Sequence, residues 1–473
     1  MMEEQIQQAS SFNPVAFGMV LVLACFIWRL PRRFAVCPLL IMTCLMPLGQ
    51  ELVVLGLHFH LFRVLLLVGA IRVIVKGEAA RLVLTRTDKL LAWWAVVTAL
   101  FGTMAKPSMN LFIARSGDVY NAIGCYFFVR CVIVDFEDIV TSVRTLAWLS
   151  LAVAVLMVVE KTTAHNLLSV FGGVPPITFV REGHLRCQGA FRHPILAGTF
   201  GATQFPLFVA LWFYRPRYRR LAVAAVISSL LIVIAASSSG ALMALFAGMV
   251  GLTLWKCRRY MRLIRWGVVV TILGLALVMK APIWYLFARL SDVTGGTGWH
   301  RAWLIDQTIA HFDEWWLFGT TYTAHWGPAG EVIAADPNMM DITNHYVMEG
   351  VKGGLLKLVL FVAVIVGCFK TIGRRIRVAA ARAPARFFVW AMGASLFGHC
   401  LSFMSILYFD QSIVIWYWLL AVISSLGCLP LAKAVRGVGA RPAVATASRN
   451  WKAILNSRLP NSRLPLQPLQ DCQ

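Results

Sequence analysis

Charged residues are scarce in this chain of 473 residues. They make up 14% of it, whereas hydrophobic residues make up 59%. A water-facing surface needs a larger charged share, roughly 25% of the residues in an ordinary soluble domain. The composition therefore excludes a soluble enzyme and a disordered chain. Apolar runs of about 18 to 22 residues recur instead. Because helices satisfy their own backbone in lipid, we predict an all-α, polytopic integral membrane protein.

Acidic residues are scarcer than basic ones. The chain has 21 Asp and Glu against 44 Lys and Arg, which gives a formal net charge of +23. In a soluble protein this balance would indicate nucleic-acid binding. In a membrane protein, basic residues gather in cytoplasmic loops and fix the orientation of the helices. We therefore expect membrane lipids, and no nucleic acid, among the partners.

A framework of paired cysteines is also missing. Ten of the eleven Cys lie in apolar runs, at their ends or in the C-terminal tail. Only Cys187 lies in a segment that we place outside the membrane. The sequence therefore excludes a secreted disulfide scaffold.

Apolar runs predict about 12–13 transmembrane helices. The runs cover 14–28, 34–49, 52–75, 89–104, 119–134, 146–159, 194–214, 221–236, 240–255, 263–279, 354–372, 387–408 and 412–431. The second run is short and Arg63 lies within the third. Twelve spans with a re-entrant second segment is therefore the alternative to thirteen.

Charges beside the first run indicate the orientation. Glu3 and Glu4 precede it, and Arg29, Arg32 and Arg33 follow it, which places the N-terminus outside. Residues 1–433 then form the transmembrane domain, with long outer segments at 161–193 and 280–350. Outer loops of this length are usually functional. Residues 434–473 are expected to form a disordered, basic cytoplasmic tail.

Several arginines lie in the two outer segments, against the orientation rule. They are Arg181, Arg186, Arg192, Arg289 and Arg301. A guanidinium matches the geometry of phosphate oxygens, so these residues either anchor to lipid headgroups or bind a lipid-linked pyrophosphate. Arg301 follows a glycine-rich stretch and opens a predicted helix over 299–312, at a terminus whose free N–H groups attract anions.

Four motifs occur in order between Arg181 and Leu360. They are Arg186-Cys-Gln-Gly189-Ala-Phe-Arg192-His-Pro194, Ser237-Ser-Ser-Gly240, Gly298-Trp-His-Arg301-Ala-Trp303 followed by Trp316-Leu-Phe-Gly319, and Thr343-Asn344-His345-Tyr346 leading to Gly353-Gly354-Leu355. Together they resemble the motifs of the O-antigen ligase and O-antigen polymerase superfamily. The chain departs from that pattern at Ser239, where the family has Arg, and at Thr343, where the family has His.

The resemblance implies a membrane glycosyltransferase of the bacterial inner membrane. Such an enzyme transfers a glycan, with inversion, from an undecaprenyl-pyrophosphate-linked donor to a hydroxyl of a glycan, lipid or protein acceptor. It implies that Arg186 and Arg301 hold the pyrophosphate, with no metal and no cofactor. Ligase and polymerase activity both stay open.

Further residues are assigned by their position in the motifs or, for Arg289, as an arginine of the outer segment 280–350. His345 is the first candidate for the general base, because an imidazole with a pKa near 6.5 accepts a proton at neutral pH. Glu349 is its alternative. The residues assigned to substrate binding are Arg192, Gly189, Asn344, Arg289 and Trp303.

Competing interpretations come from different protein classes. A secondary transporter or flippase of the cell-envelope polysaccharide pathway is the main one, and a membrane scaffold or sensor is another. Metal binding by outer acidic residues competes with the arginine pair, although no His-x-x-x-His or Asp-x-Asp pattern is present. The acidic residues concerned are Asp306, Asp313, Glu314, Asp336 and Asp341.

Overall fold

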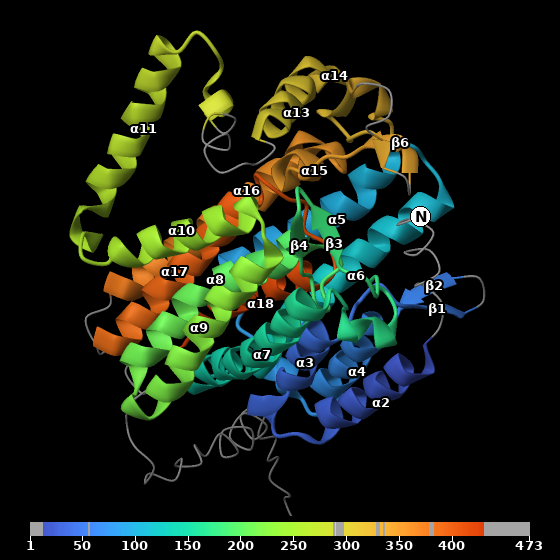
Figure 1. The fold of residues 1–473 in the computed structure, drawn as a ribbon, viewed down its shortest axis with the longest axis vertical. Helices are drawn as coiled ribbons and strands as arrows, with labels where there is room; N and C mark the ends of the chain where they lie inside the picture. Colours follow the sequence, from blue (N-terminus) through green and yellow to red (C-terminus); the bar gives the residue numbers. More distant parts are fainter. Residues whose placement is uncertain are drawn as a thin grey trace, which may run out of the picture. The chain divides into compact units, whose positions relative to one another are not determined.

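Helices make up most of the structure, as predicted. The computed structural model describes residues 13–54, 57–286, 289, 298–327, 332–333, 336–377 and 383–429. The helices are α2 (Pro14–Arg29), α3 (Cys37–Leu45), α4 (Leu61–Val75), α5 (Arg86–Met104), α6 (Met109–Val132), α7 (Phe136–Thr163), α8 (Pro194–Tyr214), α9 (Arg219–Ala236), α10 (Ser239–Thr253), α11 (Met261–Val278), α13 (Gly298–Ala310), α14 (Phe312–Trp315), α15 (His345–Val351), α16 (Gly354–Arg377), α17 (Ala383–Ser402) and α18 (Gln411–Leu426). Figure 1 shows their arrangement.

Short strands form three antiparallel hairpins among the described residues. They are β1 (Glu51–Val54) with β2 (Leu57–His60), β3 (Phe179–Arg181) with β4 (His184–Arg186), and β5 (Val332–Ile333) with β6 (Asp336–Met340). Short 3-10 helices occur at Arg32–Phe34, Glu78–Arg81, Leu167–Phe171, Pro216–Tyr218, Arg258–Tyr260, Ile283–Tyr285 and Ala324–Trp326. The hairpins are a small departure from the predicted all-α class.

Among the described residues, five helical segments are long and apolar enough to cross a membrane, by length and composition. They are Phe136–Thr163, Pro194–Tyr214, Pro216–Ala236, Arg258–Val278 and Gly354–Arg377. Because α8 keeps the bounds predicted from its apolar run and α13 begins within one residue of its prediction, the hydropathy pattern located these elements well. The predicted tail lies outside the described residues.

Two predicted spans are wrong in part. The run at 34–49 contains the nine-residue α3, which at 1.5 Å per residue is about half as long as a bilayer core is thick. Met46 ends α3 in an extended conformation, which the following Pro47 favours. The run at 52–75 begins with the β1–β2 hairpin, where the β-branched Val53 and Val54 favour strands, and only α4 is helical.

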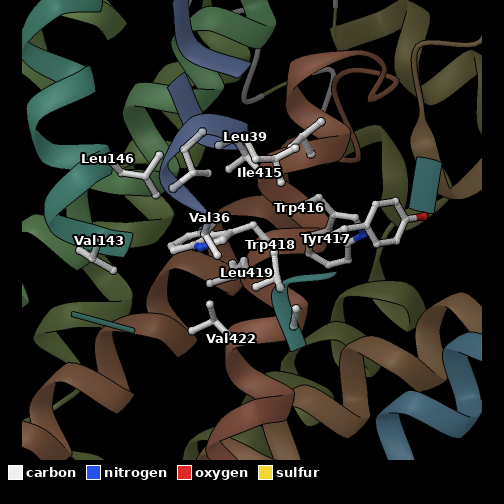
Figure 2. Packing of buried hydrophobic residues seen from close by; sticks show 14 of the residues in the cluster. Val36, Leu39, Val143, Leu146, Ile415, Trp416, Tyr417, Trp418, Leu419 and Val422 are labelled. Atoms are coloured by element: carbon white, nitrogen blue, oxygen red, sulfur yellow. The ribbon is translucent and has the colours of Figure 1, made fainter. Parts of the chain in front are cut away.

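The interior is built around α18. All of its residues from Gln411 to Leu426 except Ile413 are buried, because an apolar helix without a polar face packs on every side. Figure 2 shows its Trp418 close to Val36, just before α3, and the ring of Trp416 packs on Phe403 with centroids 4.8 Å apart. The helices α8, α9, α10 and α17 pack against one another. In contrast, α11 has no buried residue.

Polar caps fix the starts of the helices nearest the predicted site. His193 caps α8, since its Nδ1 accepts the N–H of Ile195 at 3.1 Å, and Pro194 occupies the first helical position. Asn344 caps α15, where its Oδ1 accepts the N–H groups of Tyr346 and Val347 at 3.0 and 3.3 Å. Each of the two motifs that contain these residues therefore includes the start of a helix, α8 or α15.

Candidate functional site

Arg186 ends the β3–β4 hairpin and points into the protein. Arg186 pairs with Phe179 across the hairpin and is only 6% exposed. The Nε atom is buried without a hydrogen-bond partner. A buried donor left unpaired costs free energy, and this one is part of a cation. Arg186 therefore has a buried donor that no described residue uses.

Glu160, near the C-terminus of α7, holds the segment that follows Arg186. Its Oε2 accepts the N–H of Gly189 at 2.8 Å, and its Oε1 accepts the N–H of Gln188 at 3.1 Å and the hydroxyl of Thr178 at 3.2 Å. The carboxylate is 1% exposed. Sequence analysis missed Glu160, because its apolar run gives no signal of a partner 28 residues away.

Arg301 lies in the first turn of α13, as predicted, and is 7% exposed. Burial lowers the pKa of both Arg301 and Arg186, and the charge of Arg181 lowers each pKa further. Arg181 therefore lies close enough to act on both. Among the described residues, no carboxylate lies within ion-pair distance of Arg186 or Arg301. The charge of Arg181 thus acts on both of the other arginines, while Arg181 itself lies 3.3 Å from the carboxylate of Glu182.

His193 belongs to the same region. Burial lowers its pKa to about 4, and Arg186 and Arg181 lower it as well. Its imidazole is therefore neutral at physiological pH, and its Nδ1 is used as a helix cap. Sequence analysis quoted His193 within the first motif but gave it no role.

The second motif lies against the first. The hydroxyl of Ser237 donates to the carbonyl of Leu185 at 3.2 Å, and the N–H of Cys187 donates to the carbonyl of Ala235 at 3.1 Å. Lys161 donates to both Leu185 and Ser237. The end of α9 and the turn that follows it therefore hold both sequence neighbours of Arg186, Leu185 and Cys187, in place.

The third and fourth motifs interlock through two glycines. Gly319 and Gly354 have φ of +87° and +78°, which side chains of L residues rarely adopt. A Cβ at Gly319 would overlap the carbonyl of Val351, and one at Gly354 would overlap that of Leu317. The N–H of Thr320 donates to Val351 at 2.8 Å across the same contact. The glycines thus allow the end of the α13–α14 segment to pack on the start of α16.

The connection between α17 and α18 joins the motifs. The side-chain amide of Gln411 donates to the carbonyl of Ala190 at 2.6 Å. Asp410 lies 3.7 Å from Arg192, and Ser405 lies so close to Gly240 that a Cβ there would approach its hydroxyl to 2.8 Å. The sequence predicted only the apolar runs at 387–408 and 412–431 on either side of this connection and gave it no role.

His345 lies inside the protein, beside this connection. It is 7% exposed, and its ring stacks on Phe403 with centroids 4.8 Å apart. Its Nδ1 accepts the N–H of Tyr408 at 3.3 Å, and its Nε2 lies 4.0 Å from Glu349. Burial lowers its pKa to about 4, against the opposing charge of Glu349. In this arrangement the acceptor nitrogen of the neutral imidazole is already occupied.

The charges that act on His345 differ from those that act on the arginines. The charges that act on its pKa are those of Glu349, Lys357 and Lys352. Those that act on Arg186 are Arg181 and Glu182. The base role of His345 therefore stays a prediction. It would require the ring to give up the hydrogen bond that its Nδ1 accepts from Tyr408.

We expect stability to fall as the pH is lowered from 6.5 to about 4. The His345 imidazole has a pKa near 6.5 in the unfolded chain but about 4 in the folded one. The unfolded chain binds more protons than the folded chain in this window. The contribution of His345 to the free energy of unfolding is therefore complete above pH 6.5 and lost towards pH 4. It amounts to about 3 kcal/mol.

Thermal unfolding at a series of pH values tests this. The slope should be shallower in His345→Gln than in the wild type, while His184→Gln, at an exposed position, should keep the wild-type slope. Equal slopes for the wild type and His345→Gln would contradict the assignment.

The residues assigned to substrate binding have different surroundings. Gly189 is buried, and its N–H and carbonyl are used by Glu160 and by Asn166, the latter at 2.8 Å. Asn344 serves as a helix cap, and Arg192 is partly exposed beside Asp410. Arg289 is exposed, and its neighbours in sequence lie outside the described residues. Trp303 is half-buried and stacks on the exposed Trp299, with centroids 6.1 Å apart.

Two of the outer acidic residues, Asp306 and Glu314, have separate partners. Asp306 accepts hydrogen bonds from Trp284 at 2.7 Å and from Tyr285. Glu314 instead lies between His311 and His325. In the part of the chain that the structure describes, these three form the one group of His, Cys, Asp and Glu side chains that could hold a metal ion.

Comparison of the sequence with models of protein families and with curated proteins gives no match.

Proposed function

We propose that the protein transfers a glycan from an undecaprenyl-pyrophosphate-linked donor to an acceptor hydroxyl at the outer face of the bacterial inner membrane. The observation that carries this proposal is the pair Arg186 and Arg301, both buried and both without an acidic partner among the described residues. Two guanidiniums without an acidic partner, both affected by the charge of Arg181, are suited to a ligand with two or more negative charges. The four-motif resemblance supports the same substrate class.

The pyrophosphate is a good leaving group, so the catalyst needs chiefly to hold it and neutralise the charge that grows on it. Arg186 and Arg301, both buried, would do both. The aromatic pair Trp299 and Trp303 offers a flat apolar surface on which a sugar ring could stack. A base is less necessary with such a leaving group, which agrees with the buried, neutral state of His345.

The membrane part of the proposal rests on five long apolar helices and on the charges of the loops. We propose 12–13 spans, with the segments 161–193 and 280–350 outside. Arg186 and Arg301 come from these two segments. A polyprenyl chain in the bilayer would then present its pyrophosphate at the level of the arginines.

We expect purified protein to transfer glycan from a polyprenyl-pyrophosphate donor in the presence of excess EDTA. The two guanidiniums can take the place that a divalent cation would fill beside the pyrophosphate. The assay pairs the donor with a panel of glycan, lipid and protein acceptors, and follows the product by mass spectrometry. The matched donor with a single phosphate serves as the control and should react far more slowly. Loss of transfer in EDTA, with rescue by Mg²⁺ or Mn²⁺, would contradict the mechanism.

A transporter or flippase is the second candidate, and buried charges within the helices favour it. Asp88 of α5 and Arg130 of α6 are 2.9 Å apart and almost completely buried, as ion-coupling residues of transporters often are. Both are fully hydrogen-bonded to each other and to neighbouring hydroxyls, which also suits a static role. Movement of a lipid-linked glycan across vesicles without transfer to any acceptor would select this candidate.

A further inference from the structure

Three side chains between His311 and His325 converge on one point of the segment 280–350. The Nδ1 of His311 lies 2.8 Å from the Oε1 of Glu314, and the Nε2 of His325 lies 2.9 Å from the same oxygen. The three ligand atoms lie within 4.8 Å of one another. His311 and Glu314 flank the start of α14, and His325 lies in the 3-10 helix Ala324–Trp326, so two separate elements meet here.

Neighbouring aromatic rings hold these side chains in place. The ring of His311 stacks on Trp326, with centroids 5.4 Å apart and planes at 6°. The ring of His325 stacks on Tyr322 at 4.9 Å and 15°. The indole N–H of Trp326 donates to the Oε2 of Glu314 at 3.0 Å, which leaves Oε1 as the oxygen that faces both imidazoles. The donor atoms are therefore oriented before any ligand arrives.

We propose that His311, Glu314 and His325 bind a zinc ion. Two imidazoles and one carboxylate are a common ligand set for Zn²⁺, whereas Mg²⁺ and Ca²⁺ prefer oxygen ligands. Tetrahedral bonds of about 2.0–2.1 Å separate ligand atoms by roughly 3.4 Å, so the two short contacts need to widen by only about half an ångström. The side chains are 27%, 30% and 36% exposed, so a fourth position is open to water and to entry of the ion.

The ion would stabilise a buried cluster that packs against α13. Trp326 follows His325, and Trp315 follows Glu314. Both tryptophans belong to the second buried cluster of the chain, together with Leu304 of α13. A metal that joins the two elements would therefore fix this cluster beneath α13. This role is separate from glycan transfer, because the arginines that carry that proposal take no part in it.

Zinc content and cobalt spectra of the purified full-length protein test the site. After incubation with Zn²⁺ and removal of the excess, about one zinc per chain is expected. His311→Ala and His325→Ala should lose it, and Trp326→Phe should bind roughly 10- to 100-fold more weakly because the carboxylate loses its outer hydrogen bond. His165→Ala, at an exposed histidine outside the group, should bind like the wild type. Co²⁺ should give the absorption bands of a tetrahedral site, and excess Mg²⁺ should not compete.

Melting temperature gives a second readout that does not depend on counting bound metal. Zn²⁺ should raise that of the wild type relative to the protein in EDTA, because it binds the folded chain preferentially. The increase should be absent in His311→Ala and His325→Ala. Wild-type protein that takes up no zinc and melts at the same temperature with and without it would overturn the proposal. Zinc uptake that persists in both histidine variants would overturn it as well.

Discussion

Replacing Arg301 by Lys should lower glycan transfer by about 10²- to 10³-fold, which is the usual cost of removing one donor that stabilises charge in a transition state. The same is expected of Arg186→Lys. Lysine keeps the charge but loses the planar fork that contacts two phosphate oxygens at once. Because both guanidiniums are buried, a lysine at either position would leave part of the developing charge without a hydrogen bond.

Initial rates at saturating donor, together with donor affinity, measure the effect of each variant. Arg81→Lys, at an exposed arginine outside the four motifs, is the matched control and should keep the wild-type rate. Membrane insertion and melting temperature should be unchanged in all three variants. If Arg301→Lys and Arg301→Ala both retain full activity, Arg301 anchors headgroups instead, and the proposed mechanism fails.

Elements with a strong local signal could be predicted from the sequence. The bounds of α8 follow from an unbroken apolar run that begins at Pro194, and the start of α13 follows from the glycines before it. Arg186 and Arg301 could be singled out because a cation in an outer segment contradicts the orientation rule. Both arginines are buried in the structure, and their role in binding stays a prediction.

Partners that are distant in the sequence could not be predicted. Glu160 reaches Gly189, and Gln411 reaches Ala190 across 221 residues, and neither pairing leaves a periodic pattern. The burial of His345 depends in the same way on the connection between α17 and α18. Local sequence gives the type of a side chain, whereas its protonation and its free lone pairs depend on the elements that pack around it.

The buried ion pair of Glu349 and Lys357, next to His345, should contribute a large share of the free energy of unfolding. Lys357 of α16 is 3% exposed and lies 3.5 Å from Glu349, which is 8% exposed and accepts the indole N–H of Trp94 at 2.7 Å. We expect Lys357→Met to lower the free energy of unfolding by about 3–5 kcal/mol, because Glu349 would keep a buried charge without its partner. Thermal or denaturant unfolding of the purified protein measures the loss. Lys370→Met, at an exposed position of the same helix, should change it little.

The double variant Glu349→Gln with Lys357→Met separates a lost pair from a lost contact. Glutamine keeps an oxygen that can accept from Trp94 but has no charge to compensate, so the double variant should recover most of the stability that Lys357→Met loses. The single variant Glu349→Gln tests the catalytic alternative for Glu349. If its carboxylate were the base, transfer should fall about 10²- to 10⁴-fold in Glu349→Gln even where the fold is stable. If it only neutralises Lys357, activity should follow stability across the three variants. A double variant less stable than Lys357→Met alone would show that Glu349 is held by contacts other than this charge pair.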